Sequence, residues 1–146
     1  MTESRTKPAP KHLWIVGIVT LLWNLMGAFD YLMTQTRNES YMSQFTPEQL
    51  EFFYGFPTWV DATWALAVWG AVAGSIALLL RRRVAGPLFF VALLSLIATS
   101  IHNFGMKDGA ALMGSGAVIF TVVIYLVAIG EIAYARFLCV RGITRW

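Results

Sequence analysis

The 146-residue chain has little of what soluble and redox-active proteins are built from. Only 13% of its residues are charged, and it holds one cysteine and two histidines. Cys139 has no second cysteine for a disulfide or a CxxC pair, which excludes a thiol oxidoreductase and a cysteine-based haem or zinc site. The sequence offers no catalytic nucleophile paired with a general base, no phosphate-binding loop and no complete set of metal ligands. We therefore expect neither an enzyme nor a cofactor.

Apolar residues, by contrast, make up 58% of the chain, and the mean hydropathy is +0.63. About twenty consecutive apolar residues can cross the ~30 Å hydrocarbon core of a bilayer as a helix. The sequence therefore predicts an all-α integral membrane protein, a four-helix antiparallel transmembrane bundle in one domain over residues 13–138. The helices are expected over about 13–34, 58–80, 87–104 and 112–138, between a mobile tail at 1–12 and a second tail at 139–146.

The basic residues predict the orientation of this bundle. If successive helices cross the membrane in opposite directions, nine of the eleven basic residues lie on one side of it, and only Arg37 and Lys107 lie on the other. The positive-inside rule then places both termini in the cytoplasm. The nine are Arg5, Lys7, Lys11, Arg81, Arg82, Arg83, Arg136, Arg141 and Arg145. They sit at the ends of apolar runs rather than on one basic face, so nucleic acid is not an expected partner. Trp146 is expected to anchor at the interface.

Residues 35–57 form the one sizeable loop, which this orientation places in the periplasm. Thr46 and Gln49 flank Pro47 in the pattern of a capping box, which predicts a short helix. The run that follows is rich in aromatic residues and stops at Gly55, as is typical of a short amphipathic helix lying in the headgroup region.

Asn24 lies near the middle of the first helix, where lipid offers its amide no hydrogen-bond partner. We expect its partner to be Ser95 or Thr99 at similar depth on the third helix. One interpretation makes Asn24 a contact that holds helices together. The other makes it a wall of a polar pocket shared with Tyr31 and Tyr125.

Four chemically active residues are expected at one outer level: Asp30 and Tyr31 at the end of the first helix, Asp61 at the start of the second, and His102 at the end of the third. Carboxylates and histidine near the rim of a membrane can bind a polar solute, a proton or a metal ion. We expect them to face one vestibule. The alternative is that they cap helix ends and contact headgroup water.

Glu131 lies near the inner end of the fourth helix, five residues before Arg136. That spacing is poor for direct pairing within a helix. We expect its carboxylate either to extend to the interface or to contact the Arg81–Arg83 hairpin.

A segment of the form WNxxGxxDY, over Trp23, Asn24, Gly27, Asp30 and Tyr31, precedes the loop sequence TPEQLEFFYGFPTWV and an arginine hairpin. This arrangement resembles a set of small bacterial four-helix inner-membrane proteins that often carry the automatic label "sugar transporter". The resemblance covers nearly the whole chain. It implies a bacterial inner-membrane protein with this segment as its signature.

Two functions from different classes follow. The first is a small polar solute carrier or channel subunit, which would act as a homo-oligomer because four helices hardly enclose a path with alternating access. Its substrate-binding residues would be Asn24, Asp30, Tyr31, Asp61, His102 and Tyr125. The second is a non-transporting membrane protein that binds a partner through its outer loop.

Overall fold

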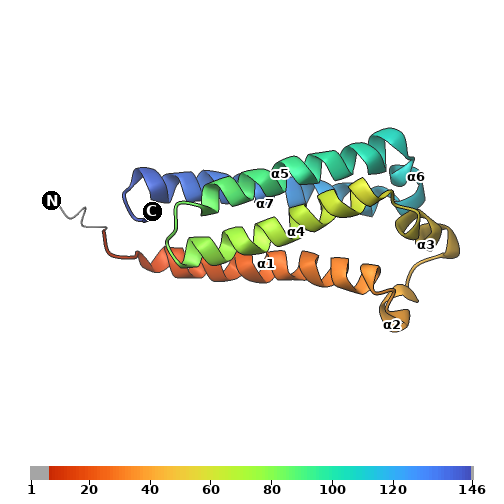
Figure 1. Ribbon diagram of the computed structural model, residues 1–146, viewed down its shortest axis with the longest axis horizontal. Coiled ribbons are helices and arrows are strands. Elements are labelled where there is room, and N and C mark those ends of the chain that lie inside the picture. Colours follow the sequence, from red (N-terminus) through yellow and green to blue (C-terminus); the bar gives the residue numbers. More distant parts are fainter. Residues whose placement is uncertain (1–6, 146) are drawn as a thin grey trace.

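The computed structural model describes residues 7–145 and confirms the all-α bundle. In Figure 1 the four long helices lie side by side, with the first and last described residues, Lys7 and Arg145, at one end of the bundle and the short helices at the other. We name these the terminal end and the loop end. The elements are α1 (Lys11–Gln35), α2 (Glu39–Met42), α3 (Pro47–Tyr54), α4 (Thr58–Leu79), α5 (Ala85–Ser100), η1 (Ile101–Met106), α6 (Gly109–Met113) and α7 (Ser115–Val140).

Within the described residues, four helical spans are long and apolar enough to cross a membrane: Lys11–Gln35, Thr58–Leu79, Ala85–Met106 and Ser115–Val140. Large apolar side chains cover their outer surfaces, and Leu22, Leu66, Leu94 and Ile119 are each at least half exposed. Such an exterior suits contact with lipid rather than water. The molecule thus has the build of a multi-pass membrane protein.

The observed helices differ from the predicted ones mainly at the loop end. The third continues beyond 104 as the π-helical turn η1. The fourth begins at Ser115 rather than 112, because Gly114 has a φ of 82° and interrupts the helix between α6 and α7. Glycine adopts this left-handed conformation without steric cost.

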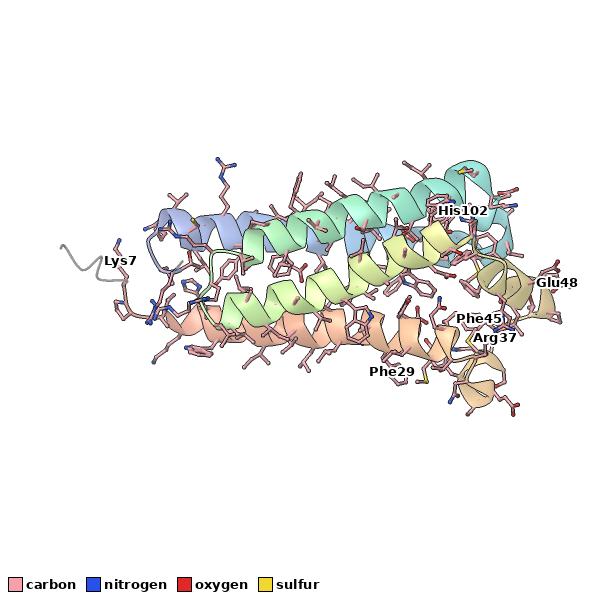
Figure 2. All side chains as sticks on the ribbon, in the orientation of Figure 1. Lys7, Phe29, Arg37, Phe45, Glu48 and His102 are labelled. Atoms are coloured by element: carbon pink, nitrogen blue, oxygen red, sulfur yellow. The ribbon has the colours of Figure 1, made fainter. Side chains whose placement is uncertain are left out.

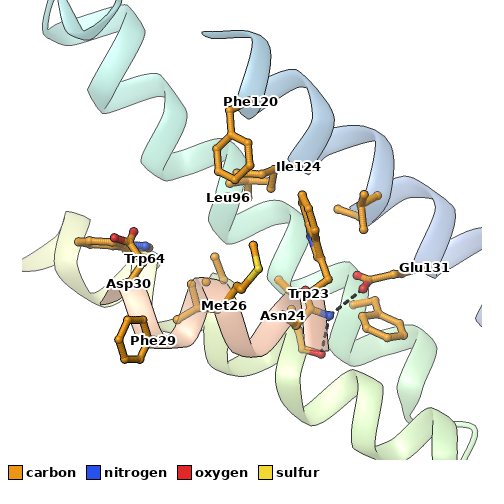
Figure 3. A pocket seen from close by; sticks show the side chains of 18 of the residues that line it. Trp23, Asn24, Met26, Phe29, Asp30, Trp64, Leu96, Phe120, Ile124 and Glu131 are labelled. Atoms are coloured by element: carbon orange, nitrogen blue, oxygen red, sulfur yellow. Dashed lines mark hydrogen bonds between the residues drawn. The ribbon is translucent and has the colours of Figure 1, made fainter. Parts of the chain in front are cut away.

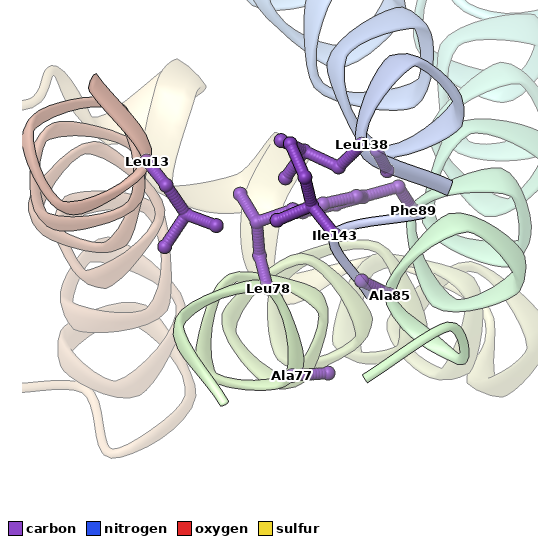
Figure 4. Close-up of a cluster of buried hydrophobic side chains, with 8 residues drawn as sticks. Leu13, Ala77, Leu78, Ala85, Phe89, Leu138 and Ile143 are labelled. Atoms are coloured by element: carbon purple, nitrogen blue, oxygen red, sulfur yellow. The ribbon is translucent and has the colours of Figure 1, made fainter. Parts of the chain in front are cut away.

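A cluster of buried apolar side chains holds the helices together near the terminal end. Figure 4 shows Leu13 from α1, Leu78 from α4, Phe89 from α5 and Leu138 from α7 converging there, together with Ile143. Phe89 lies directly over Gly74, where a β-carbon would come within 2.7 Å of its ring. The Gly70 and Gly74 pair of α4 therefore faces α5 and lets the two helices approach closely.

Main-chain hydrogen bonds tie the terminal end together. The amide of Arg83 donates to the carbonyl of Arg145 (2.8 Å), and that of Lys7 donates to the carbonyl of Gly142 (3.3 Å). The Arg81 guanidinium donates to the carbonyls of Ile143 (3.0 Å) and Lys7. Lys7, which falls in the predicted mobile tail, is thus hydrogen-bonded to the hairpin and to the C-terminal segment, and α1 begins at Lys11. Two predictions concern residues outside the described ones: that Arg5 lies on the cytoplasmic side, and that Trp146 anchors at the membrane interface.

At the loop end the predicted capping box is confirmed. The Thr46 hydroxyl accepts from the Gln49 amide (3.3 Å), and the Gln49 side chain accepts from the Thr46 amide (3.1 Å). Gln49 also donates to the carbonyl of Leu112 (3.3 Å), which ties α3 to α6. Figure 2 shows Arg37, Phe45, Glu48 and His102 at this end and Lys7 at the other.

The four long helices do not pack equally closely on one another. Helix α1 packs on α4, α4 on α5, and α5 on α7, whereas α1 and α7 do not pack closely backbone to backbone within the described residues. Long side chains bridge them instead. His12 Nδ1 lies 2.6 Å from the Tyr134 hydroxyl, and the Trp23 and Phe120 rings lie 5.9 Å apart between centroids. This separation leaves room for a cavity between the two helices.

Candidate functional site: a cavity between α1 and α7

A cavity of about 430 Å³ lies between α1, α4, α5 and α7, with Tyr41 of α2 at its loop end. This volume is within the ~300–1,000 Å³ range of small-molecule sites. Figure 3 shows Glu131 and Asp30 toward opposite sides of the view, with Trp23 and Met26 between them. The cavity therefore has a polar group at each end and a largely apolar wall between.

Glu131 and Asn24 form its inner polar end. The Asn24 amide donates to Glu131 Oε1 (2.7 Å) and Ser75 Oγ (2.9 Å), and its nitrogen lies 3.3 Å from the carbonyl of Ala71. Ser75 is fully buried, and Glu131 is 5% exposed. One amide thus joins α1 to both α4 and α7 near the middle of α1.

This arrangement corrects two predictions from the sequence. Asn24 does not pair with Ser95 or Thr99, because α1 packs on α4 rather than α5; Thr99 instead bonds Thr63 of α4 (2.9 Å). Glu131 does not contact the arginine hairpin either. It is directed into the bundle, where Asn24 holds it.

Asp30 and Tyr41 form the polar end near the loops. The Tyr41 hydroxyl donates to Asp30 Oδ1 at 2.6 Å, and its ring meets Phe29 edge to face at 5.7 Å. Burial, the hydrogen bond to Asp30 and the charge of Asp30 together raise the pKa of Tyr41 to about 12. Tyr41 is therefore a neutral donor at physiological pH and fixes the direction of the Asp30 carboxyl group.

The other predicted site residues lie elsewhere. Tyr31 packs edge to face on Trp64 at 5.1 Å, and Asp61 accepts from the Gln35 amide at 2.8 Å. His102 is buried between the rings of Phe56 and Trp59. Tyr125 is half-buried on α7. Of the six predicted residues, only Asn24 and Asp30 are among the described residues that line the cavity. The residues that were expected to face one vestibule therefore do not share one site.

The sequence prediction missed Glu131 and Tyr41 as parts of the site. An acidic side chain inside a membrane span with no base one turn away is a signal that could have identified Glu131. Tyr41 gave no such signal, since it belongs to a loop whose fold over the helices is a tertiary feature.

Within residues 7–145, no group of three or more His, Cys, Asp or Glu side chains gathers in a way that could hold a metal ion. What the cavity offers is two carboxyl groups, one amide, one phenol and aromatic surface. These groups can bind an organic molecule by hydrogen bonds, charge and apolar contact.

The chain was compared with family models, curated proteins and solved structures, and none of them matches it.

Proposed function

We propose that this protein is a membrane carrier, acting as a homo-oligomer, for a small molecule that binds in the cavity between α1 and α7. The observation behind the proposal is the cavity itself, which holds polar groups at both ends within a bundle of membrane-spanning length. Polar and ionisable side chains are costly inside a membrane and are typical of substrate or ion pathways there. The distribution of bases supports cytoplasmic termini.

The wall of the cavity favours a different solute from the polar one that the sequence predicted. Between its polar ends the lining is apolar, with residues such as Met26, Val68, Leu96 and Ile124. A sugar would leave most of its hydroxyl groups without partners there, at a cost of roughly 1–3 kcal/mol each. A solute with an apolar body and few polar groups fits the lining better.

The second hypothesis, binding of a partner protein through the outer loop, has less support. The loop aromatics that would contact a partner are half-buried and pack on one another: the Phe45 and Phe53 rings are 5.3 Å apart, as are those of Phe52 and Phe56. Phe56 in turn packs on His102. These rings therefore hold the loop onto the bundle.

Cysteine accessibility tests the carrier proposal without knowledge of the substrate. In a Cys139→Ser background, Val127→Cys places a thiol on the cavity wall, whereas Ile129→Cys places one on the exposed outer face of the same helix. Thiolates react in water, and lipid keeps a thiol protonated. We expect a membrane-impermeant methanethiosulfonate reagent to modify the Val127 variant at least about tenfold faster in proteoliposomes. Equal, slow reaction of both would show that the cavity lacks aqueous access and would refute the carrier.

A further inference from the structure

The charges around the cavity are unbalanced. Two carboxyl groups, Asp30 and Glu131, line it, and Tyr41 is the remaining titratable side chain; no lysine, arginine or histidine of the described residues takes part. The partners of the carboxyl groups are uncharged, Tyr41 for Asp30 and Asn24 for Glu131. Neither carboxyl group has an ion-pair partner in the part of the chain that the structure describes.

An unpaired carboxylate in apolar surroundings is costly, and its cost falls when an opposite charge is placed beside it. Residues 7–145 supply hydrogen-bond donors to these two groups but no counter-charge. A positively charged ligand would supply that charge, whereas an anion would be repelled at both ends of the cavity.

The wall adds a second, independent feature. Aromatic rings border the cavity from several elements: Trp23 and Phe29 of α1, Tyr41 of α2, Trp64 of α4, Phe89 of α5 and Phe120 of α7. The face of an aromatic ring attracts a cation, most strongly when the cation is desolvated. Carboxylates together with aromatic faces are the surroundings in which organic cations are bound.

We propose that the molecule carried is a lipophilic organic cation, with its charge near Glu131 or Asp30 and its apolar body against the aromatic wall. This inference rests on the proposed function and specifies its substrate class. A bare metal ion does not fit, because it would need several oxygen ligands at one point, and the two carboxyl groups lie at opposite ends. Asn24 is then a positioning residue, since it fixes the Glu131 carboxyl group from across the cavity.

The test uses two ions of the same shape and opposite charge, tetraphenylphosphonium and tetraphenylborate, titrated calorimetrically into the purified full chain in detergent. We expect the cation to bind at least about tenfold more tightly than the anion. Of Glu131→Gln and Asp30→Asn, the variant that removes the carboxyl group beside the bound charge should weaken cation binding about tenfold or more. The matched control is Glu48→Gln, which removes an exposed carboxylate on α3 and should leave binding unchanged. Equal binding of both ions, or unchanged binding in both cavity variants, would overturn the inference.

A second measurement keeps the inference testable if the cavity variants do not fold. Tetraphenylphosphonium should protect the Val127→Cys thiol from modification, and tetraphenylborate should not. If the thiol is reactive and neither ion protects it, the cation assignment is wrong while the carrier proposal stands. If the thiol is unreactive without any ligand, the carrier proposal itself fails.

Discussion

At the scale of single residues, Gly74 decides how closely α4 and α5 approach. A β-carbon there would meet the Phe89 ring at 2.7 Å, so the ring or one of the two helices would have to shift, and Phe89 is packed in the core with 1% of its surface exposed. We predict that Gly74→Ala lowers the free energy of unfolding by about 1–3 kcal/mol, as is usual when a packed core is overfilled. Thermal unfolding of the detergent-solubilised protein measures it.

Gly130→Ala is the matched control for this substitution. Gly130 is also in a helix interior, but a β-carbon there would meet no atom within 4 Å. Alanine should be neutral or slightly stabilising at this position, because it is the better helix former. Equal stability of the two variants would show that the α4–α5 contact is looser than described.

Tyr41 is a second residue on which the site depends. We predict that Tyr41→Phe costs about 1 kcal/mol of stability near neutral pH, because it removes the hydrogen bond to Asp30. It should also change binding at the loop end of the cavity, where the Asp30 carboxyl group would lose its fixed direction. Chemical unfolding in mild detergent measures the first effect.

The pH dependence of that difference gives a further check. The pKa of Tyr41 is raised to about 12 in the folded protein, above about 10 for an unfolded tyrosine. Folding therefore favours the neutral phenol, and this contribution is fully present below about pH 10 and is lost as the pH rises through about 12. The stability difference between wild type and Tyr41→Phe should shrink over that interval. A difference that stays constant up to pH 12 would contradict the Tyr41–Asp30 contact.

At the scale of elements, Arg81 connects the α4–α5 hairpin to both ends of the chain. It has a left-handed backbone (φ 59°), and its guanidinium donates to carbonyls of Ile143 and Lys7. We predict that Arg81→Ala frees both terminal segments and that the amides of Lys7 and Arg145 exchange hydrogen about tenfold faster, as expected for a lost bond of about 1.4 kcal/mol.

Arg82→Ala serves as the control for that experiment. Arg82 is the next residue in the same hairpin, and its side chain is exposed. It carries the same charge, but its contact within the hairpin is made by the main chain, where its amide donates to the carbonyl of Ala77 (2.8 Å). Exchange at Lys7 and Arg145 should be as slow as in wild type. Equal acceleration by both substitutions would point to charge rather than to the hydrogen bonds of Arg81.

At the scale of the whole molecule, the orientation in the membrane is the main prediction. The segment at 7–10, the hairpin at 81–83 and the C-terminal residues up to 145 lie together at the terminal end and carry most of the bases. A reporter fused after Trp146 should be active only as a cytoplasmic probe, and one inserted near Ser43 only as a periplasmic probe. The opposite pattern would reverse the assignment of both faces.

Hydropathy and length determined the number of spans, their approximate limits and the depth of each residue, because a helix rises 1.5 Å per residue and lipid fixes the level of its apolar run. That is why Asn24 was correctly expected in the middle of α1. The capping box of Thr46 and Gln49 was equally readable, since it depends on residues three positions apart.

Only the tertiary structure decided which polar groups meet. Lipid is as apolar as the bundle interior, so the faces of a span differ little in hydropathy, and the sequence does not fix the rotation of a helix or the choice of its neighbours. The contact between Asn24 and Glu131 joins residues 107 positions apart across the gap between α1 and α7. His102 and Asp61 were expected at the level of Asp30, but they contact Phe56 and Gln35 rather than the cavity. The sequence predicts how far along its helix a residue lies, whereas the rotation and packing of the helices decide which residues share a site.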